Sequence, residues 1–204
     1  MKAYDAAGNV GTNPSIAVTV NNAAPPVATG PAGPAGNWTK VFGDEFNGTA
    51  LDTTKWSPNW YGEGGTMNKV GTYAANVSES NGSLNLTLAS STSGALVHTN
   101  YTTGRYQLPI GGYVEASVYF PGSTSSNCSN WPAWWASGPS WPAAGEHDIA
   151  EVLSGQLTVN YHSSSGPHNQ GAVAGTWCGA YPTYGLQRLA SSANVSWDGG
   201  PVGA

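Results

Sequence analysis

The sequence predicts an all-β protein built as a β-sandwich. Apolar and polar residues alternate in several short runs, at positions 84–88, 114–120, 157–161 and 195–197. Alternation with a period of two is typical of a strand that buries one face. Clusters of Gly, Asn, Ser and Pro separate these runs, and no stretch has a convincing helical period. Many short strands with such punctuation indicate a sandwich or a barrel.

Three segments follow one another along the chain. Residues 1–22 alternate at positions 16–20 and resemble the last hairpin of an immunoglobulin-like or fibronectin-like module. Residues 23–37 are rich in Pro, Ala and Gly, which indicates a semi-rigid interdomain linker. Residues 38–204 hold the other alternating runs, and a segment of this length can bury a sizeable core.

The charge of the chain limits its partners. The 204 residues carry a net charge of -5 with only six Lys and Arg, and these are scattered. We therefore expect a monomer that binds neither nucleic acid nor membrane, and a neutral polymer suits its surface better. Low charge and abundant Ser, Thr, Asn and Gly are typical of a secreted protein, although the chain shows no signal peptide at its start. Cys128 and Cys178 can form a disulfide if they meet in space, and two separate thiols are the alternative.

Three carboxyl groups crowd into the run Glu146-His147-Asp148-Ile149-Ala150-Glu151. Side chains alternate faces along a strand, so Glu146 and Asp148 share one face and Glu151 should point away from it. A one-residue bulge between Asp148 and Glu151 would return Glu151 to the shared face, and bulges are common beside active sites. Two carboxyl groups flanking a glycosidic bond suit glycoside hydrolysis, and a separation of roughly 5 Å selects the retaining route. The third carboxyl group can help to separate the pKa values of the other two.

Acidic residues on a strand more often simply face water. Here only 8% of the residues are charged, and apolar Ile149, Val152 and Leu153 bracket the carboxyl groups. This pattern indicates a buried strand, where unpaired carboxylates are costly unless a site uses them. We therefore favour catalysis over a solvated face.

Aromatic side chains point to a sugar-binding groove. The chain has nine Trp and ten Tyr against three Phe. Their flat apolar faces with a polar edge suit the C–H face of a sugar ring. The candidate groove residues are Trp131, Trp134, Trp135 and Trp141, just before the acidic run, and Trp60 in a Gly-rich stretch. The alternative is a place in the core, which we expect for either Trp134 or Trp135 because neighbours on a strand face opposite sides.

Five blocks of the chain resemble the laminarinase-like branch of glycoside hydrolase family 16 (GH16). One is the Glu-x-Asp-x-x-Glu signature at residues 146–151. The others, in the order that the family has them, lie within residues 41–56, 101–105, 112–116 and 131–135. The resemblance covers about residues 38–204 and implies a jelly-roll β-sandwich of the concanavalin A-like kind with a sugar-binding groove.

The resemblance also implies roles for individual residues. Glu146 would be the nucleophile, Glu151 the general acid and base, and Asp148 the residue that assists and orients the nucleophile. His162, on the next expected strand, resembles a histidine that often lies beside the family's carboxylates, and a surface histidine is the alternative. Arg105 ends a family-like block and is expected to contact substrate.

The chain departs from the family pattern in three ways. His147 stands where the family usually has an aliphatic or aromatic core residue, and we expect burial to hold it neutral. Glu45 resembles a ligand of the structural calcium seen in some members, but its usual C-terminal partner would lie beyond Ala204, so we expect no cofactor. Related domains continue for further strands, which predicts that the catalytic domain is incomplete at its C-terminal end and has an exposed edge.

Three functions fit these observations. The leading one is a retaining endo-acting hydrolase of β-1,3-glucan or mixed β-1,3/1,4-glucan, with agar, carrageenan and galactan left open as substrates. The second is a polysaccharide-binding sandwich without activity. The third takes the site as a divalent metal centre, since carboxylates and imidazole are metal ligands. Its ligands would be Glu146, Asp148, Glu151 and His162.

Overall fold

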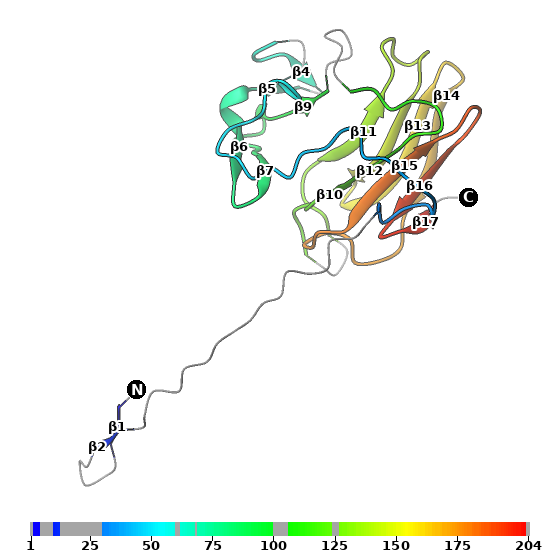
Figure 1. The fold of residues 1–204 in the computed structure, drawn as a ribbon. Helices are drawn as coiled ribbons and strands as arrows, with labels where there is room; N and C mark the ends of the chain where they lie inside the picture. The colour runs from blue at the N-terminus through cyan, green and yellow to red at the C-terminus, as the bar shows by residue number, and fades with distance from the viewer. Residues whose placement is uncertain are drawn as a thin grey trace.

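The computed structural model describes residues 2–4, 10–12, 30–59, 62–67, 69–99, 106–123 and 127–202. The regular secondary structure of the described part is almost entirely β-strand, as Figure 1 shows, and its helical content is a single 3-10 turn at Ala74–Asn76. No helix in these ranges is long and apolar enough to cross a membrane. The prediction of an all-β jelly-roll sandwich is confirmed.

Two four-stranded antiparallel sheets form the body of the domain (Figure 1). The first sheet, which we call the carboxylate sheet, has the order β11 (Ala133–Ser137), β12 (Glu146–Leu153), β13 (Gln156–Ser163) and β14 (Gly166–Ala172). The second, the back sheet, has the order β10 (Tyr113–Ser117), β15 (Thr183–Arg188), β16 (Ala193–Trp197) and β17 (Gly200–Val202). The strands expected from alternation at 114–120, 157–161 and 195–197 correspond to β10, β13 and β16.

The core lies between the two sheets. From the carboxylate sheet it takes Ile149, Val152, Leu157 and Val159, and from the back sheet Tyr184, Leu186 and Trp197, all nearly inaccessible to solvent. These residues occupy one face of each strand, as the period-two pattern requires. The opposite face of the carboxylate sheet is thereby left for polar side chains.

Smaller sheets precede the sandwich in the chain. The strand pairs are β3 (Ser57–Pro58) with β9 (Val97–His98) and β6 (Val77–Ser80) with β7 (Ser83–Leu86), and the three-stranded sheet is β4 (Thr66–Met67), β5 (Val70–Thr72) and β8 (Ser93–Gly94). β7 corresponds to the alternating run at 84–88.

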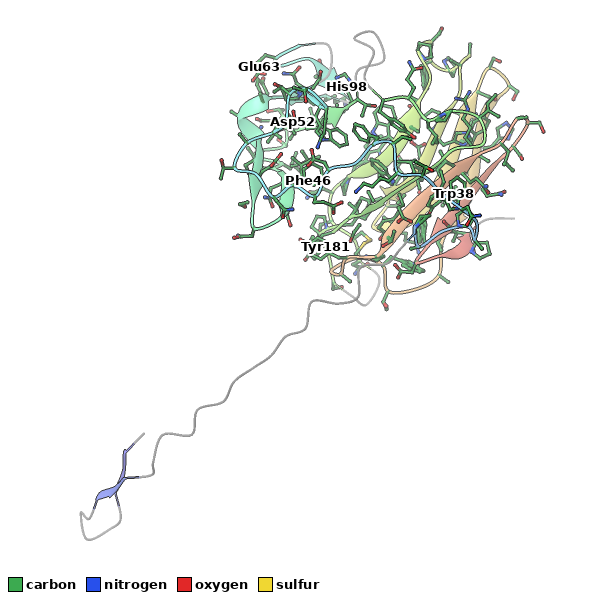
Figure 2. The ribbon with its side chains drawn as sticks, viewed as in Figure 1. Trp38, Phe46, Asp52, Glu63, His98 and Tyr181 are labelled. Atoms are coloured by element: carbon green, nitrogen blue, oxygen red, sulfur yellow. A yellow bond between two sulfur atoms is a disulfide. The ribbon has the colours of Figure 1, made fainter. Side chains whose placement is uncertain are left out.

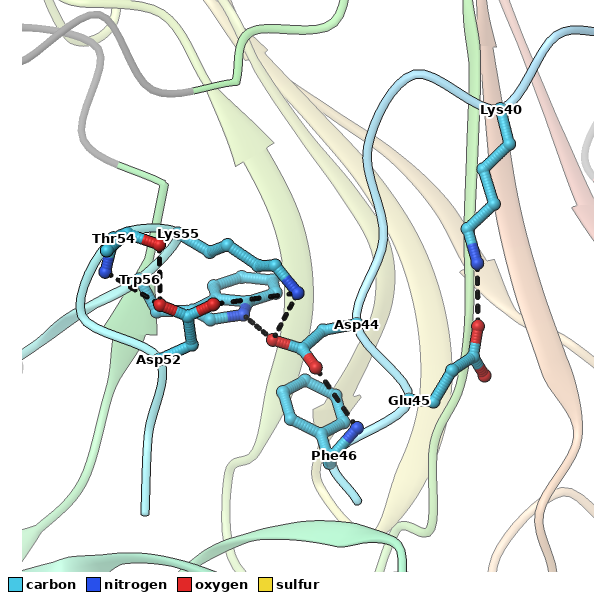
Figure 3. Close-up of polar contacts among 8 residues, drawn as sticks. All are labelled: Lys40, Asp44, Glu45, Phe46, Asp52, Thr54, Lys55 and Trp56. Carbon is cyan, nitrogen blue, oxygen red and sulfur yellow. Dashed lines mark hydrogen bonds and ion pairs between the residues drawn. The ribbon is translucent and has the colours of Figure 1, made fainter. Parts of the chain in front are cut away.

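Charged side chains fold the segment before β3 onto itself (Figure 3). Asp44 accepts a hydrogen bond from Trp56 Nε1 at 3.1 Å, and Lys55 Nζ lies 3.3 Å from the same carboxylate oxygen. Glu45, the suggested calcium ligand, is instead paired with Lys40 at 2.6 Å. Among the described residues, Glu45 belongs to no group of three or more potential metal ligands. The expectation that the chain has no cofactor stays untested.

Residues 30–38 lie on the outer face of the back sheet rather than extending away from it. The main-chain N–H of Ala32 points at both carboxylate oxygens of Glu115, at 3.1 and 3.0 Å. The Trp38 ring is 5.9 Å from that of Tyr113, which lies on the same face of β10 as Glu115. Figure 2 labels Trp38 beside these strands. Part of the segment expected to be a linker thus packs on the domain, while residues 23–29 fall outside the described ranges.

The N-terminal strands β1 (Lys2–Tyr4) and β2 (Val10–Thr12) form an antiparallel pair. The alternating positions 16–20 lie outside the described residues. The proposed domain boundaries therefore stay predictions.

The two cysteines form a disulfide, with a Cα–Cα distance of 5.6 Å. Cys128 precedes β11, and Cys178 lies in the loop between β14 and β15. The bond therefore ties the approach to the first strand of the carboxylate sheet to the connection that leads into the back sheet.

Candidate active site

A bulge in β12 brings the three carboxyl groups together. Asp148 pairs with Asn160 and Glu151 with Thr158, so three steps along β12 match only two along β13. The pairing with β11 shows the same excess, because Trp135 pairs with Asp148 and Trp134 with Ala150. Ile149 has no partner in either register. The extra residue returns Glu151 to the face of Glu146 and Asp148, as the sequence predicted.

Glu146 lies at the start of β12, next to an indole and an imidazole. Trp141 Nε1 donates a hydrogen bond to its Oε1 at 3.3 Å, and His162 Nε2 lies 3.9 Å from the same oxygen. Burial raises the pKa of Glu146, the Trp141 hydrogen bond and the His162 charge oppose this rise, and the Glu151 charge adds to it. The net direction is upward, and the two neighbours therefore favour the ionised form against the effect of burial.

Asp148 is the most deeply buried of the three carboxyl groups, with 5% of its surface exposed. Burial, and then the charges of Glu151 and Glu146, raise its pKa to about 8. Its Oδ2 lies 3.3 Å from His162 Nε2 but has no hydrogen-bond partner. Asp148 therefore carries a proton near neutrality.

Glu151 is held on both of its oxygens. Trp131 Nε1 donates to Oε1 at 2.6 Å, and Asn160 Nδ2 donates to Oε2 at 2.6 Å. The sequence predicted the contact of Trp131 with the site but missed Asn160. The signal was present, because residues 158, 160 and 162 form the polar face of the strand whose apolar face was recognised at 157, 159 and 161.

The two tryptophans of β11 separate as expected. Trp134 packs against the core, and Trp135 pairs across the strands with Asp148, so it shares the face of the carboxyl groups. The exposed candidates are Trp131 and Trp141, at 55% and 61%. They stand beside Glu151 and Glu146, which places an open indole at each outer carboxyl group.

His162 lies within the site and not on a separate surface. Its ring centroid is 6.0 Å from that of Trp141, and it contacts both Glu146 and Asp148. One oxygen of each of these carboxyl groups and one His162 nitrogen lie within 4.8 Å of one another. This spacing would accommodate a cation, so the metal reading still needs an experiment.

His147 faces the other side of β12. Its ring lies 4.5 Å from that of Tyr161, its cross-strand partner. Burial lowers the pKa of His147, and the Arg188 charge lowers it further. The neutral state expected from the sequence agrees with this direction. Two other candidates, Trp60 and Arg105, lie outside the described residues.

The sequence around this site matches a known family. Residues 121–176 match the model of the XgeA-like catalytic domain of GH16. This stretch contains all of β11 to β14, and with them the three carboxyl groups of the site, Trp131 and Trp141. This part of the chain is similar to a GH16 catalytic domain. The resemblance read from the sequence is confirmed, and a comparison with the curated proteins finds no match.

Solved structures share the GH16 fold with this chain. A mutant of SCLam, a non-specific endo-β-1,3(4)-glucanase crystallised with 1,3-β-D-cellotriosyl-glucose, is 21% identical with a TM-score of 0.63, over 83% of this chain and 75% of that one. An endo-β-1,3-glucanase from Pyrococcus furiosus is 18% identical with a TM-score of 0.58, over 78% and 71% of the two chains.

A third similar structure comes from work on endo-acting O-glycanases with which human gut bacteria initiate mucin breakdown. It is 22% identical with a TM-score of 0.63, over 85% of this chain and 73% of that one. At such identities the likeness establishes the fold. Since the three proteins are described by different substrates, the shared fold does not by itself name a substrate for this chain.

Proposed function

We propose that the chain is a retaining, endo-acting glycoside hydrolase of β-1,3-glucan or mixed β-1,3/1,4-glucan. The observation that carries the proposal is the bulge of β12, which sets Glu146, Asp148 and Glu151 on one face with an exposed indole at each outer carboxyl group. Two carboxyl groups flanking the scissile bond are the equipment of this chemistry. The glucanase relatives favour a glucan over the other polymers.

In the proposed reaction, Glu146 attacks the anomeric carbon while Glu151 protonates the glycosidic oxygen, so that the C–O bond breaks and a glycosyl ester forms on Glu146. Water then attacks the anomeric carbon, Glu151 accepts its proton, and Glu146 leaves. Trp131 and Trp141 are the surfaces on which the flanking sugar rings stack.

The electrostatics support this division of roles. The raised pKa of Asp148 keeps that group neutral near pH 7, which spares the nucleophile a second adjacent negative charge. The Trp141 N–H and the His162 ring act on Glu146 itself and favour its ionised form. A neutral carboxyl group beside the nucleophile is also a hydrogen-bond donor at a pH where a free Asp is not.

The test is reducing-sugar release from laminarin, mixed-linkage glucan and agarose, run side by side for this chain and its Glu146→Gln variant. We expect release from a glucan, loss of turnover in the variant and retained affinity for the polymer. Undiminished turnover in the variant would rule out Glu146 as the nucleophile. Release from agarose alone would move the substrate to a galactan.

Two controls distinguish the other readings. A polysaccharide-binding sandwich would retain affinity without any release from the three polymers. The metal reading is favoured by the spacing of Glu146, Asp148 and His162, and it requires that a chelator abolish activity. From the low charge and the abundance of Ser, Thr, Asn and Gly, we also propose that the protein acts outside cells, as a monomer.

A further inference from the structure

Asn160 is a buried side chain that faces the three carboxyl groups from β13. Only 2% of its surface is exposed, and it lies opposite Asp148 in the strand register. Nothing in the family-like blocks of the sequence pointed to it. Its burial at a site of ionisable groups requires a reason, because a buried amide is costly unless its hydrogen bonds are made.

Both protons of the Asn160 amide group are in use. One is donated to Glu151 Oε2 at 2.6 Å, and the other to Thr158 Oγ1 at 3.0 Å. Thr158 in turn donates its hydroxyl proton to the main-chain oxygen of Glu151 at 2.9 Å. The three hydrogen bonds close a ring that begins at the backbone of Glu151 and ends at its carboxylate.

This ring fixes the orientation of one side chain relative to its own backbone. A glutamate has three rotatable side-chain bonds, and a general acid works only within hydrogen-bond reach of the atom it protonates. Trp131 holds the other oxygen, Oε1, but its indole is exposed and must be free to meet the sugar. Of the two donors to the Glu151 carboxyl group, Asn160 is the buried one, so its hydrogen bond need not break when a sugar stacks on Trp131.

The side-chain oxygen of Asn160 argues against a purely structural role. Its Oδ1 is buried without a hydrogen-bond partner, and a buried unsatisfied acceptor costs about 1–3 kcal/mol. An apolar residue of similar size would avoid that cost. The amide is explained by what its nitrogen does for Glu151.

We infer that Asn160 is a positioning residue that, with Thr158, holds Glu151 in place as the general acid and base. The inference rests on the proposed function, since it assumes that Glu151 protonates the leaving group.

The experiment uses two β-laminaribiosides that differ in their need for acid assistance. The phenyl glycoside has a poor leaving group and needs a proton, whereas the 2,4-dinitrophenyl glycoside does not. General acid catalysis contributes roughly 10²–10⁴-fold to a rate, so a misplaced acid should lose part of that range. For Asn160→Ala we expect kcat/KM on the phenyl glycoside to fall by roughly ten- to a hundredfold. On the dinitrophenyl glycoside the loss should stay below about threefold, because the acid step is bypassed there.

Three further variants make the result decisive. Thr158→Val removes the second anchor and should show the same split to a smaller degree, even if Asn160→Ala folds poorly. Asn169→Ala is the matched control, because Asn169 is the exposed cross-strand partner of Asn160 on β14 and should leave both rates unchanged. Glu151→Ala should give a larger split than Asn160→Ala, with azide restoring turnover of the dinitrophenyl glycoside.

The outcomes separate the two hypotheses. Equal losses on both glycosides in Asn160→Ala and Thr158→Val, with a clear split in Glu151→Ala, would overturn the role of Asn160 and leave the hydrolase intact. No split and no azide effect in Glu151→Ala, or no hydrolysis of either glycoside by the unaltered chain, would overturn the proposed function itself.

Discussion

Replacing Trp197 with phenylalanine should loosen the bulge on which the carboxyl groups depend. Trp197 belongs to the back sheet, and its Nε1 donates a buried hydrogen bond of 2.9 Å to the main-chain oxygen of Ile149. Ile149 is the residue that β12 has in excess over both neighbouring strands. A single indole N–H from the opposite sheet therefore donates to the main-chain oxygen of the residue that makes the bulge.

The size of the effect follows from these contacts. Phenylalanine cannot donate, so the Ile149 oxygen would be left buried and unpaired at a cost of about 1–3 kcal/mol. The missing part of the indole, about two buried carbon atoms, adds roughly 1.5 kcal/mol. Together we expect a loss of about 3 kcal/mol in the free energy of unfolding, or roughly 10 °C in Tm for a domain of this size.

The assay is urea unfolding monitored by far-UV circular dichroism, with glucan hydrolysis measured on the same samples. Trp177→Phe is the control, because Trp177 packs edge-on against Trp197 and donates only to the nearby Ala174 oxygen. Its loss should be about 1.5 kcal/mol at most, because the partly buried ring loses the same two carbon atoms while water can replace the donor at the exposed Ala174 oxygen. If Trp197→Phe matched this control in stability, or lost stability with full activity, Trp197 would not hold the bulge.

Three further predictions concern stability. Replacing Cys128 and Cys178 with serine opens a loop set by their sequence separation of 50 and should cost about 4 kcal/mol in urea unfolding, while an unchanged midpoint would mean that the bond adds nothing. His147→Ile should raise Tm, and more at pH 5 than at pH 8. The lowered pKa of His147 means that the unaltered chain loses stability as the pH falls below about 6.5. An equal or absent gain in Tm at both pH values would contradict this. Asp148→Asn should raise Tm relative to the unaltered chain at pH 8 but not at pH 4. The raised pKa of Asp148 means that the stability contributed by this group is complete below about pH 4 and is lost as the pH rises towards 8. A difference in Tm that shrinks with rising pH would refute the assignment.

The strands and the composition of the site were predictable because their signals are local. Alternation at 157–161 and 195–197 is visible within a few residues and predicted β13 and β16. The bulge was predictable only as a requirement of the proposed site, since Glu151 reaches the face of Glu146 only if one residue of the strand has no cross-strand partner.

The pairing of strands was not predictable from such signals. β10 pairs with β15, about seventy residues further along the chain, and no pattern in either strand specifies the other. The bond from Trp197 to Ile149 joins residues 48 positions apart. Asn160 was missed for another reason, because the polar face at 158, 160 and 162 does not reveal that one of its members is buried, and an asparagine on a strand is usually a surface residue.

The docking of residues 30–38 determines from which side the domain is tethered. This segment covers the outer face of the back sheet, whereas the carboxyl groups open on the outer face of the other sheet. Anything joined to the chain at residue 30 is thus anchored behind the domain, away from the carboxyl groups. Immobilising the protein through that segment would leave the carboxyl groups facing outward and accessible to a large substrate.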